Sequence, residues 1–130
     1  MKKFIRSADG LPAWSAPISH AVVVDRTCWL SGQLSLDAQG RYVSDTPAGE
    51  ARRAFGHLAR ALEAAGFTLA DMVFVDVALV DLGDVGEVNA VFAEMFAEDA
   101  RPARTVYQAA GLPFGGKVKV MGVAVKEREG

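Results

Sequence analysis

The chain has 130 residues, of which 51% are hydrophobic and 23% are charged, and its formal net charge is −2. This length and composition predict one globular domain over residues 1–130, burying roughly two thirds of its unfolded surface, and exclude a disordered chain. The 14 Lys and Arg residues are scattered along the chain, so no basic stripe points to nucleic acid as a partner.

The first part of the chain predicts three strands. Residues 3–6 form a short mixed segment that fits an edge strand, and residues 12–17 contain the turn residues of a loop. Residues 20–25 and 27–32 are rich in β-branched and aromatic side chains, which favour strands. Because only a short polar step at Asp25-Arg26 separates the two, we expect a tight hairpin.

A helix and a buried strand are predicted next. Thr46 fits an N-cap and Pro47 the first helical position, and apolar residues then recur at helical spacing until Gly66, which fits a C-terminal cap. Residues 72–80 are almost continuously apolar, apart from Asp76. Such a run predicts a strand covered on both faces.

The C-terminal part predicts a second helix and two more strands. Apolar residues at helical spacing indicate a helix that begins between Leu82 and Val85 and ends near Phe96. Residues 103–108 and 117–126 then predict two strands joined by the turn sequence GLPFGG. The order β-β-β-α-β-α-β-β fits an α+β fold, a two-layer sandwich in which both helices cover one face of a mixed sheet.

The strands predicted at residues 72–80 and 117–126 are apolar on both faces. In the last strand, one set of alternate residues is Val118, Val120, Gly122 and Ala124, and the other set is Met121, Val123 and Val125. Helices on one side leave the other apolar face exposed, and soluble monomers seldom expose such a patch. We therefore expect a homo-oligomer in which the sheets of several subunits pack against one another.

Metal sites, disulfides and membrane segments find no support in the sequence. The single cysteine, Cys28, cannot form an internal disulfide, and His20 and His57 lie too far apart to suggest metal ligands. The N-terminal MKKFIRSADG lacks the apolar run of a signal peptide, and no stretch approaches the roughly 18 residues that span a bilayer. We expect a cytoplasmic protein with no metal, cofactor or membrane partner.

Four segments together resemble the RidA (YjgF, L-PSP) family over nearly the whole chain. They are LSGQ at the end of the hairpin, VNAVFAEMF, RPARTVYQAAGLP and the terminal KVKVMGVAV. The resemblance implies a chorismate-mutase-like trimer whose sheets face inward and whose ligand clefts lie between neighbouring subunits. That assembly agrees with a sheet that is apolar on both faces.

The resemblance implies roles for several residues. Arg104, in PAR, matches the arginine that grips a substrate carboxylate, and a guanidinium suits that task because it pairs through two parallel hydrogen bonds. Ser31 and Gly32 match the stretch that lines the cleft, and Asn89 matches the asparagine of VNA. From the residues alone, each also fits a structural role: a surface arginine, a strand end and a helix-face asparagine.

Three positions depart from the family pattern. Deaminating members have a tyrosine where this chain has Ile18, a cysteine where it has Val106, and a glutamate near the last strand where it has Met121. The family glutamate is thought to position the attacking water, a task for which methionine has no suitable group. We expect Ile18, Val106 and Met121 to make the cleft apolar, and Trp14 either adds an aromatic wall or attaches its loop to the core.

Two functions follow from these observations. The first is an enamine/imine deaminase, a hydrolase that converts reactive 2-imino acids to 2-keto acids and ammonia, with a preference shifted to apolar side chains. The second is a trimer without catalytic activity that binds a small 2-keto acid or related carboxylate through Arg104. The family's occasional description as endoribonucleases or translation inhibitors receives no support from a net charge of −2.

Overall fold

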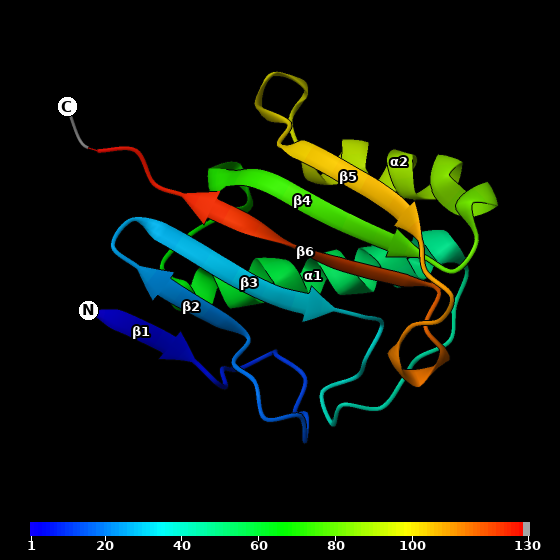
Figure 1. Ribbon diagram of the computed structural model, residues 1–130, viewed down its shortest axis with the longest axis horizontal. Helices are drawn as coiled ribbons and strands as arrows, with labels where there is room; N and C mark the ends of the chain where they lie inside the picture. The colour runs from blue at the N-terminus through cyan, green and yellow to red at the C-terminus, as the bar shows by residue number, and fades with distance from the viewer. Residues whose placement is uncertain (129–130) are drawn as a thin grey trace.

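A computed structural model of the chain describes residues 1–128 and contains six strands and two α-helices (Figure 1). In chain order these are β1 (Lys2–Ile5), β2 (Ala21–Val24), β3 (Thr27–Gln33), α1 (Pro47–Ala65), β4 (Met72–Leu79), α2 (Val85–Met95), β5 (Ala103–Gln108) and β6 (Val118–Val125). Short 3-10 turns lie at Leu69–Asp71, Leu82–Asp84, Glu98–Ala100 and Pro113–Gly115. The order of strands and helices confirms the predicted one.

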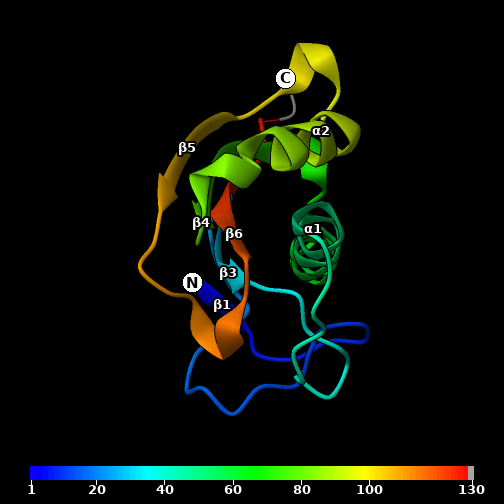
Figure 2. The ribbon, with the colours of Figure 1, turned by 90° about the vertical axis from the view of Figure 1, so that its right-hand side faces the viewer.

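The six strands form one mixed sheet, and both helices lie on the same face of it (Figure 2). The strand order is β1-β2-β3-β6-β4-β5, so β1 and β5 are the edge strands. Only β4 and β5 pair in parallel, as a strand-helix-strand unit allows, and all other neighbours are antiparallel. This is the predicted two-layer α+β sandwich.

Helix α1 has the predicted ends. The Thr46 side chain accepts a hydrogen bond from Gly49 N at 3.1 Å, and Pro47 occupies the first turn. Gly66 ends the helix in a left-handed conformation with a φ of 86°, which glycine adopts without steric cost. The caps satisfy backbone groups that would otherwise lack partners at the two ends.

Residues that share one face of α1 form the centre of the core. The helix packs against β6, β3 and β2 and against α2, and its fully buried apolar side chains are Ala51, Ala54, Phe55, Leu58, Ala61 and Leu62. Phe55 meets Phe92 of α2 and Phe96 edge to face, each with ring centroids 6.0 Å apart. These aromatic contacts fix α2 beside α1 and therefore fix the position of the residues that α2 presents to β5.

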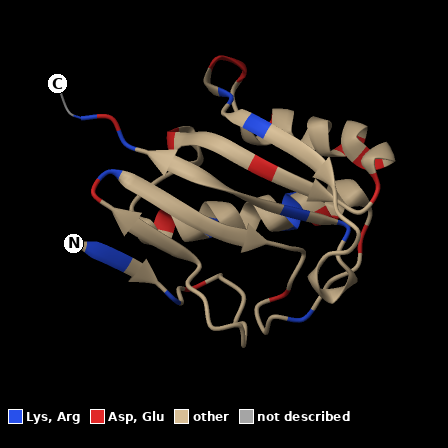
Figure 3. Ribbon diagram, in the orientation of Figure 1, with Lys and Arg blue, Asp and Glu red and all other residues tan. Residues whose placement is uncertain are grey.

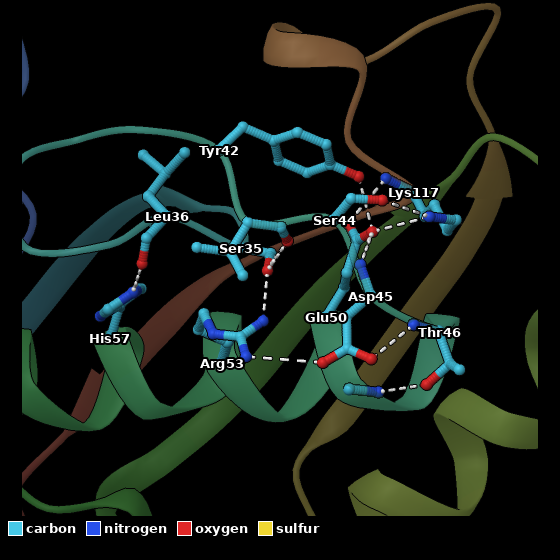
Figure 4. A network of polar contacts seen from close by, with 12 residues as sticks. Ser35, Leu36, Tyr42, Ser44, Asp45, Thr46, Glu50, Arg53, His57 and Lys117 are labelled. Atoms are coloured by element: carbon cyan, nitrogen blue, oxygen red, sulfur yellow. Dashed lines mark hydrogen bonds and ion pairs between the residues drawn. The ribbon is translucent and has the colours of Figure 1, made fainter.

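A buried carboxylate, Glu50, joins α1 to the loop before it and to the start of β6 (Figure 4). It accepts hydrogen bonds from Tyr42 Oη at 2.6 Å and from Asp45 N at 3.2 Å. It also accepts from Lys117 N and from Lys117 Nζ, both at 3.0 Å. Burial of a charge is tolerated because each carboxylate oxygen has donors.

One residue of β4 departs from regular strand alternation. Alternation alone would place Val73 on the same face as Val75, Val77 and Leu79, but Val73 is 47% exposed while these three are fully buried. The pairing of β4 with β6 shifts register between Met72 and Phe74, so Met72 takes the buried place. The irregularity moves Val73 out of the alternation, as a β-bulge does.

The sheet face opposite the helices is uncovered and largely apolar. Trp29, Val123 and Phe74 form one row across β3, β6 and β4, and Trp29 is 56% exposed. Along β3, β4, β5 and β6, charged residues are isolated among uncharged ones (Figure 3). Neither helix within residues 1–128 has the length and apolar character needed to cross a membrane.

Candidate functional site

Arg104 and Asn89, which come from different segments, meet in the structure. Arg104 lies on β5 and its Nη1 donates a hydrogen bond to Asn89 Oδ1 of α2 at 2.7 Å. The guanidinium also lies over the ring of Phe92, with 4.9 Å between Cζ and the ring centroid. The contact with Asn89 uses one of the five N–H donors of the guanidinium, so the others remain available to a ligand.

A surface pocket of about 450 Å³ surrounds this pair, lined by Asn89, Phe92, Ala93, Arg101, Pro102 and Arg104. Two guanidinium groups and no carboxylate line it, so it has the electrostatic character of an anion site. Within residues 1–128, Arg104 forms no ion pair with any carboxylate. The pocket can therefore hold a small carboxylate against Arg104 by charge-assisted hydrogen bonds.

The position of Arg104 follows from the strand that bears it. Strand β5 is the parallel edge strand beside β4, with Arg104 opposite Val75 and Val106 opposite Val77. Alternate residues of a strand share a face, so Val106 points to the helix side as Arg104 does, and it packs against the core. Val106 thus supplies an apolar surface two residues from Arg104.

Ser31 and Gly32 lie where β3 departs from regular pairing with β6. The Ser31 hydroxyl donates to the Ser19 carbonyl oxygen, and Ser31 N donates to the His20 carbonyl oxygen at 2.9 Å. Ser31 therefore ties the end of β3 to the loop that bears Ile18. A Cβ at Gly32 would approach Lys119 Cδ to 2.9 Å, so a side chain there would require the methylene groups of Lys119 to shift.

Ile18 does not line the Arg104 pocket within the chain. It is 51% exposed and lies in a separate pocket with Arg6 and Trp14. The residue after it, Ser19, accepts the hydrogen bond from Ser31 and so links this loop to the end of β3.

Met121 lies on the uncovered face of the sheet, the face opposite Arg104. It is paired with Asp76 of β4, and the Asp76 carboxylate accepts a hydrogen bond from Thr105 Oγ1 of β5. Asp76 is thus partly buried on the uncovered face, and its carboxylate is hydrogen-bonded to the neighbouring strand β5.

Lys119 is a residue of this region that the sequence reasoning missed. It shares the uncovered face of β6 with Met121, and its methylene groups lie over Gly32. Strand alternation places residue 119 beside residue 121, so the signal was available in the sequence. Within residues 1–128, the Lys119 ammonium forms no ion pair.

The seven predicted residues thus form three groups within one chain. Arg104, Asn89 and Val106 lie together at β5 and α2. Ile18 lies in the N-terminal loop, which is hydrogen-bonded through Ser19 to Ser31, beside Gly32 at the end of β3. Met121 lies on the uncovered face. Among residues 1–128, no three His, Cys, Asp or Glu side chains gather closely enough to hold a metal ion.

Comparison with known proteins identifies the class of this fold and site. The family model described as endoribonuclease L-PSP matches residues 10–126. The chain belongs to this family, which is the RidA (YjgF) family that its four sequence segments resemble.

Individual relatives cover almost the whole chain. A protein of Bos taurus named 2-iminobutanoate/2-iminopropanoate deaminase is 40% identical over 127 residues, which are 97% of this chain and 91% of the relative. The crystal structure of RidA from Psychrobacter sp. is 33% identical, with a TM-score of 0.89, and covers 95% of this chain and 100% of its own. The YjgF gene product of E. coli is 30% identical with a TM-score of 0.87, covering 96% and 99%.

Proposed function

We propose that this chain is an imine deaminase that hydrolyses reactive 2-imino acids to 2-keto acids and ammonia. The observation that supports it most directly is the guanidinium of Arg104. Within residues 1–128 it pairs with no carboxylate, and Asn89 holds it in a pocket that suits an anionic ligand. The 40% identity to a named 2-iminobutanoate/2-iminopropanoate deaminase over 97% of the chain supports the same reaction.

In the proposed reaction Arg104 binds the carboxylate of the imino acid and fixes the orientation of the adjacent C=N bond. Water adds to the carbon of that bond, the C–N bond breaks, a C=O bond forms and ammonia leaves. Orientation of a reactive group accelerates a step that already proceeds in water. Arg104 is thus the residue assigned to catalysis, through its contact with the substrate.

We further propose that the complete cleft forms between subunits of a homotrimer whose uncovered sheet faces turn inward. The uncovered face exposes apolar and aromatic side chains, among them Trp29, Val73, Tyr107 and Val125. Burial of such a face against copies of itself removes it from water. Because β5 is an edge strand, the Arg104 pocket is open to residues of a neighbouring subunit, including Ile18, Ser31, Gly32 and Met121.

Replacement of polar family residues predicts a shifted substrate range. Ile18, Val106 and Met121 present only apolar side chains, so we expect faster turnover of imines with branched or aromatic side chains than of small ones. We expect the protein to act in the cytoplasm.

The test is a competition for the free imine. An amino-acid oxidase generates the imine of leucine or 2-aminobutyrate, and semicarbazide traps it as a semicarbazone whose early accumulation is followed. The wild type should slow the accumulation of the semicarbazone, and Arg104→Ala should not. Arg104→Lys should retain partial activity, because lysine keeps the positive charge but lacks the planar group that forms two parallel hydrogen bonds. Arg52→Ala is the matched control, since Arg52 pairs with Glu94 on the helix layer. No effect of the wild type on any imine contradicts the proposal.

A second function is favoured by the residues of the Arg104 pocket. None of them is a carboxylic acid, histidine or cysteine, so none is suited to proton transfer at neutral pH. The alternative is a trimer that binds a 2-keto acid without turnover. In that case 2-keto acids should raise the melting temperature of the wild type and not of Arg104→Ala, while the imine competition shows no effect.

A further inference from the structure

Lys119 lies between Gly32 and Met121 on the uncovered face of the sheet. Its Cγ, Cδ and Cε atoms lie 3.2, 2.9 and 3.5 Å from the point that a Cβ on Gly32 would occupy, so the stem of the side chain covers this glycine. Met121 is two residues further along β6 and therefore shares the same face. Gly32 and Met121 both belong to the part of the cleft that a neighbouring subunit is proposed to supply, so Lys119 belongs to that part as well.

The Lys119 ammonium has no anionic partner within residues 1–128. It forms no ion pair, and its neighbour on β4 in the sheet register is Ala78, which carries no charge. A carboxylate on the same face, that of Asp76, accepts a hydrogen bond from Thr105 instead. Lys119 is already half-buried in the single chain. Further burial of this cation by assembly is costly unless an anion pairs with it.

The Arg104 pocket, which forms the other part of the cleft, is also cationic. Arg101 and Arg104 both line it, and none of its lining residues is a carboxylate. Binding of the carboxylate beside the C=N bond neutralises one positive charge, so a cleft with three cationic groups suits a substrate with a second negative charge. Met121, beside Lys119, offers an apolar surface that suits methylene groups.

We propose that Lys119 is a specificity-determining residue, which selects 2-imino acids whose side chain ends in a second carboxylate. Arg104 of one subunit pairs with the carboxylate next to the C=N bond, and Lys119 of the neighbouring subunit pairs with the terminal carboxylate. Met121 contacts the methylene groups between the two charges. This inference rests on the proposed function, because it takes the cleft between subunits as the substrate site.

The test compares two imines of equal length in the semicarbazide competition. Glutamate oxidase forms the imine of glutamate, and an amino-acid oxidase forms the imine of norvaline, which has the same number of carbons and a methyl group in place of the terminal carboxylate. For each imine, the measured quantity is the protein concentration that halves the accumulation of the semicarbazone. The wild type should require less protein for the glutamate imine than for the norvaline imine.

Variants of Lys119 assign this preference to its charge. Lys119→Met keeps an apolar stem over Gly32 and removes the charge, so it should require about tenfold more protein than the wild type for the glutamate imine. For the norvaline imine the two proteins should agree within about twofold. Lys119→Arg should retain the preference because it keeps the charge. Lys3→Met, at an exposed lysine of β1, is the matched control and should change neither value.

A binding measurement distinguishes failure of this inference from failure of the proposed function. The two imines yield 2-oxoglutarate and 2-oxopentanoate, which differ only in whether the last carbon is a carboxylate or a methyl group. At equal concentration, 2-oxoglutarate should raise the melting temperature of the wild type more than 2-oxopentanoate does, and Lys119→Met should abolish the difference. This comparison requires no turnover, so it tests Lys119 independently of imine hydrolysis.

Equal melting-temperature shifts with the two keto acids in the wild type would overturn the inference. A difference that survives in Lys119→Met and disappears in Arg101→Gln would also overturn it, because the second carboxylate would then bind Arg101. So would a lower sedimenting mass of Lys119→Met without ligand, since the ammonium would then belong to an ion pair between subunits. Lys119-dependent shifts without suppression of either imine would contradict the deaminase and support the role of Lys119.

Discussion

Glu50 is the residue whose charge matters most to the fold. Its side chain is fully buried and receives donors from Tyr42, Asp45 and Lys117. Burial alone raises the pKa of Glu50, but hydrogen bonds from Tyr42 and Lys117 outweigh burial and hold the pKa below its usual value of 4.5. The folded state therefore keeps this carboxylate ionised at a pH where the unfolded chain protonates it.

This shift predicts acid destabilisation. A carboxylate with a depressed folded pKa contributes stability that is complete above its unfolded pKa and is lost as the pH falls through the folded pKa. Glu50→Gln should cost about 2–3 kcal/mol in unfolding free energy at pH 7 and flatten the acid limb below about pH 4.5. Urea denaturation at pH 7 and below pH 4 measures both effects, with Glu63→Gln on the exposed face of α1 as the control. An unchanged acid limb in Glu50→Gln would contradict this account.

The thiol of Cys28 should be unreactive in the folded protein. It is fully buried on β3, and burial raises the pKa of its thiol to about 11. The thiolate is the reactive form, so a thiol reagent such as Ellman's reagent should not label the native protein at neutral pH and should label it after unfolding in urea. Rapid labelling of the native protein would show that β3 opens far more readily than its burial indicates.

Among the connecting elements, the turn between β5 and β6 contains backbone strain. Phe114 has a φ of 64°, in the left-handed region, and its side chain is 56% exposed. A non-glycine residue in that region costs about 1–2 kcal/mol relative to glycine. Phe114→Gly should therefore be more stable than Phe114→Ala, by about 1 kcal/mol in urea unfolding, because both lose the ring and only glycine removes the strain. Equal stability of the two variants would mean that the turn relaxes in another way.

The elements were predictable where local chemistry sets their ends or faces. Thr46, Pro47 and Gly66 mark α1 because capping is a property of neighbouring residues, and the alternation in β6 separates its buried set from Met121, Val123 and Val125. The displacement of Val73 was not predictable, since a register shift among consecutive apolar residues leaves the sequence pattern unchanged.

The candidate site residues were expected from the family resemblance and not from local chemistry. The meeting of Arg104 and Asn89 agrees with the resemblance of two separate segments to one family. The separation of Ile18 from Arg104, and the nearness of Lys119 to Gly32, depend on how strands are ordered across the sheet, and periodicity along a single segment does not contain that information.

At the scale of the whole molecule, the uncovered sheet face predicts assembly. The wild type should sediment at three times the 13.8 kDa of the chain. Trp29→Glu places a charge on the apolar face and should shift the mass toward that of the monomer, because burying an unpaired carboxylate in an interface is costly. Ala90→Glu, at an exposed position of α2, should leave the mass unchanged. A wild type that sediments as a monomer would contradict the proposed trimer.

The central claim is that Arg104 recognises the carboxylate of an imine, and it is tested by removing that carboxylate from the substrate. The measurement compares two imines in the semicarbazide competition: the imine of leucine, and the imine that an amine oxidase forms from 3-methylbutylamine, which has the same side chain and no carboxylate. The account predicts that the protein suppresses semicarbazone formation only for the leucine imine, and that Arg104→Ala abolishes this difference. Equal suppression for both imines, or a preference that survives in Arg104→Ala, would contradict it.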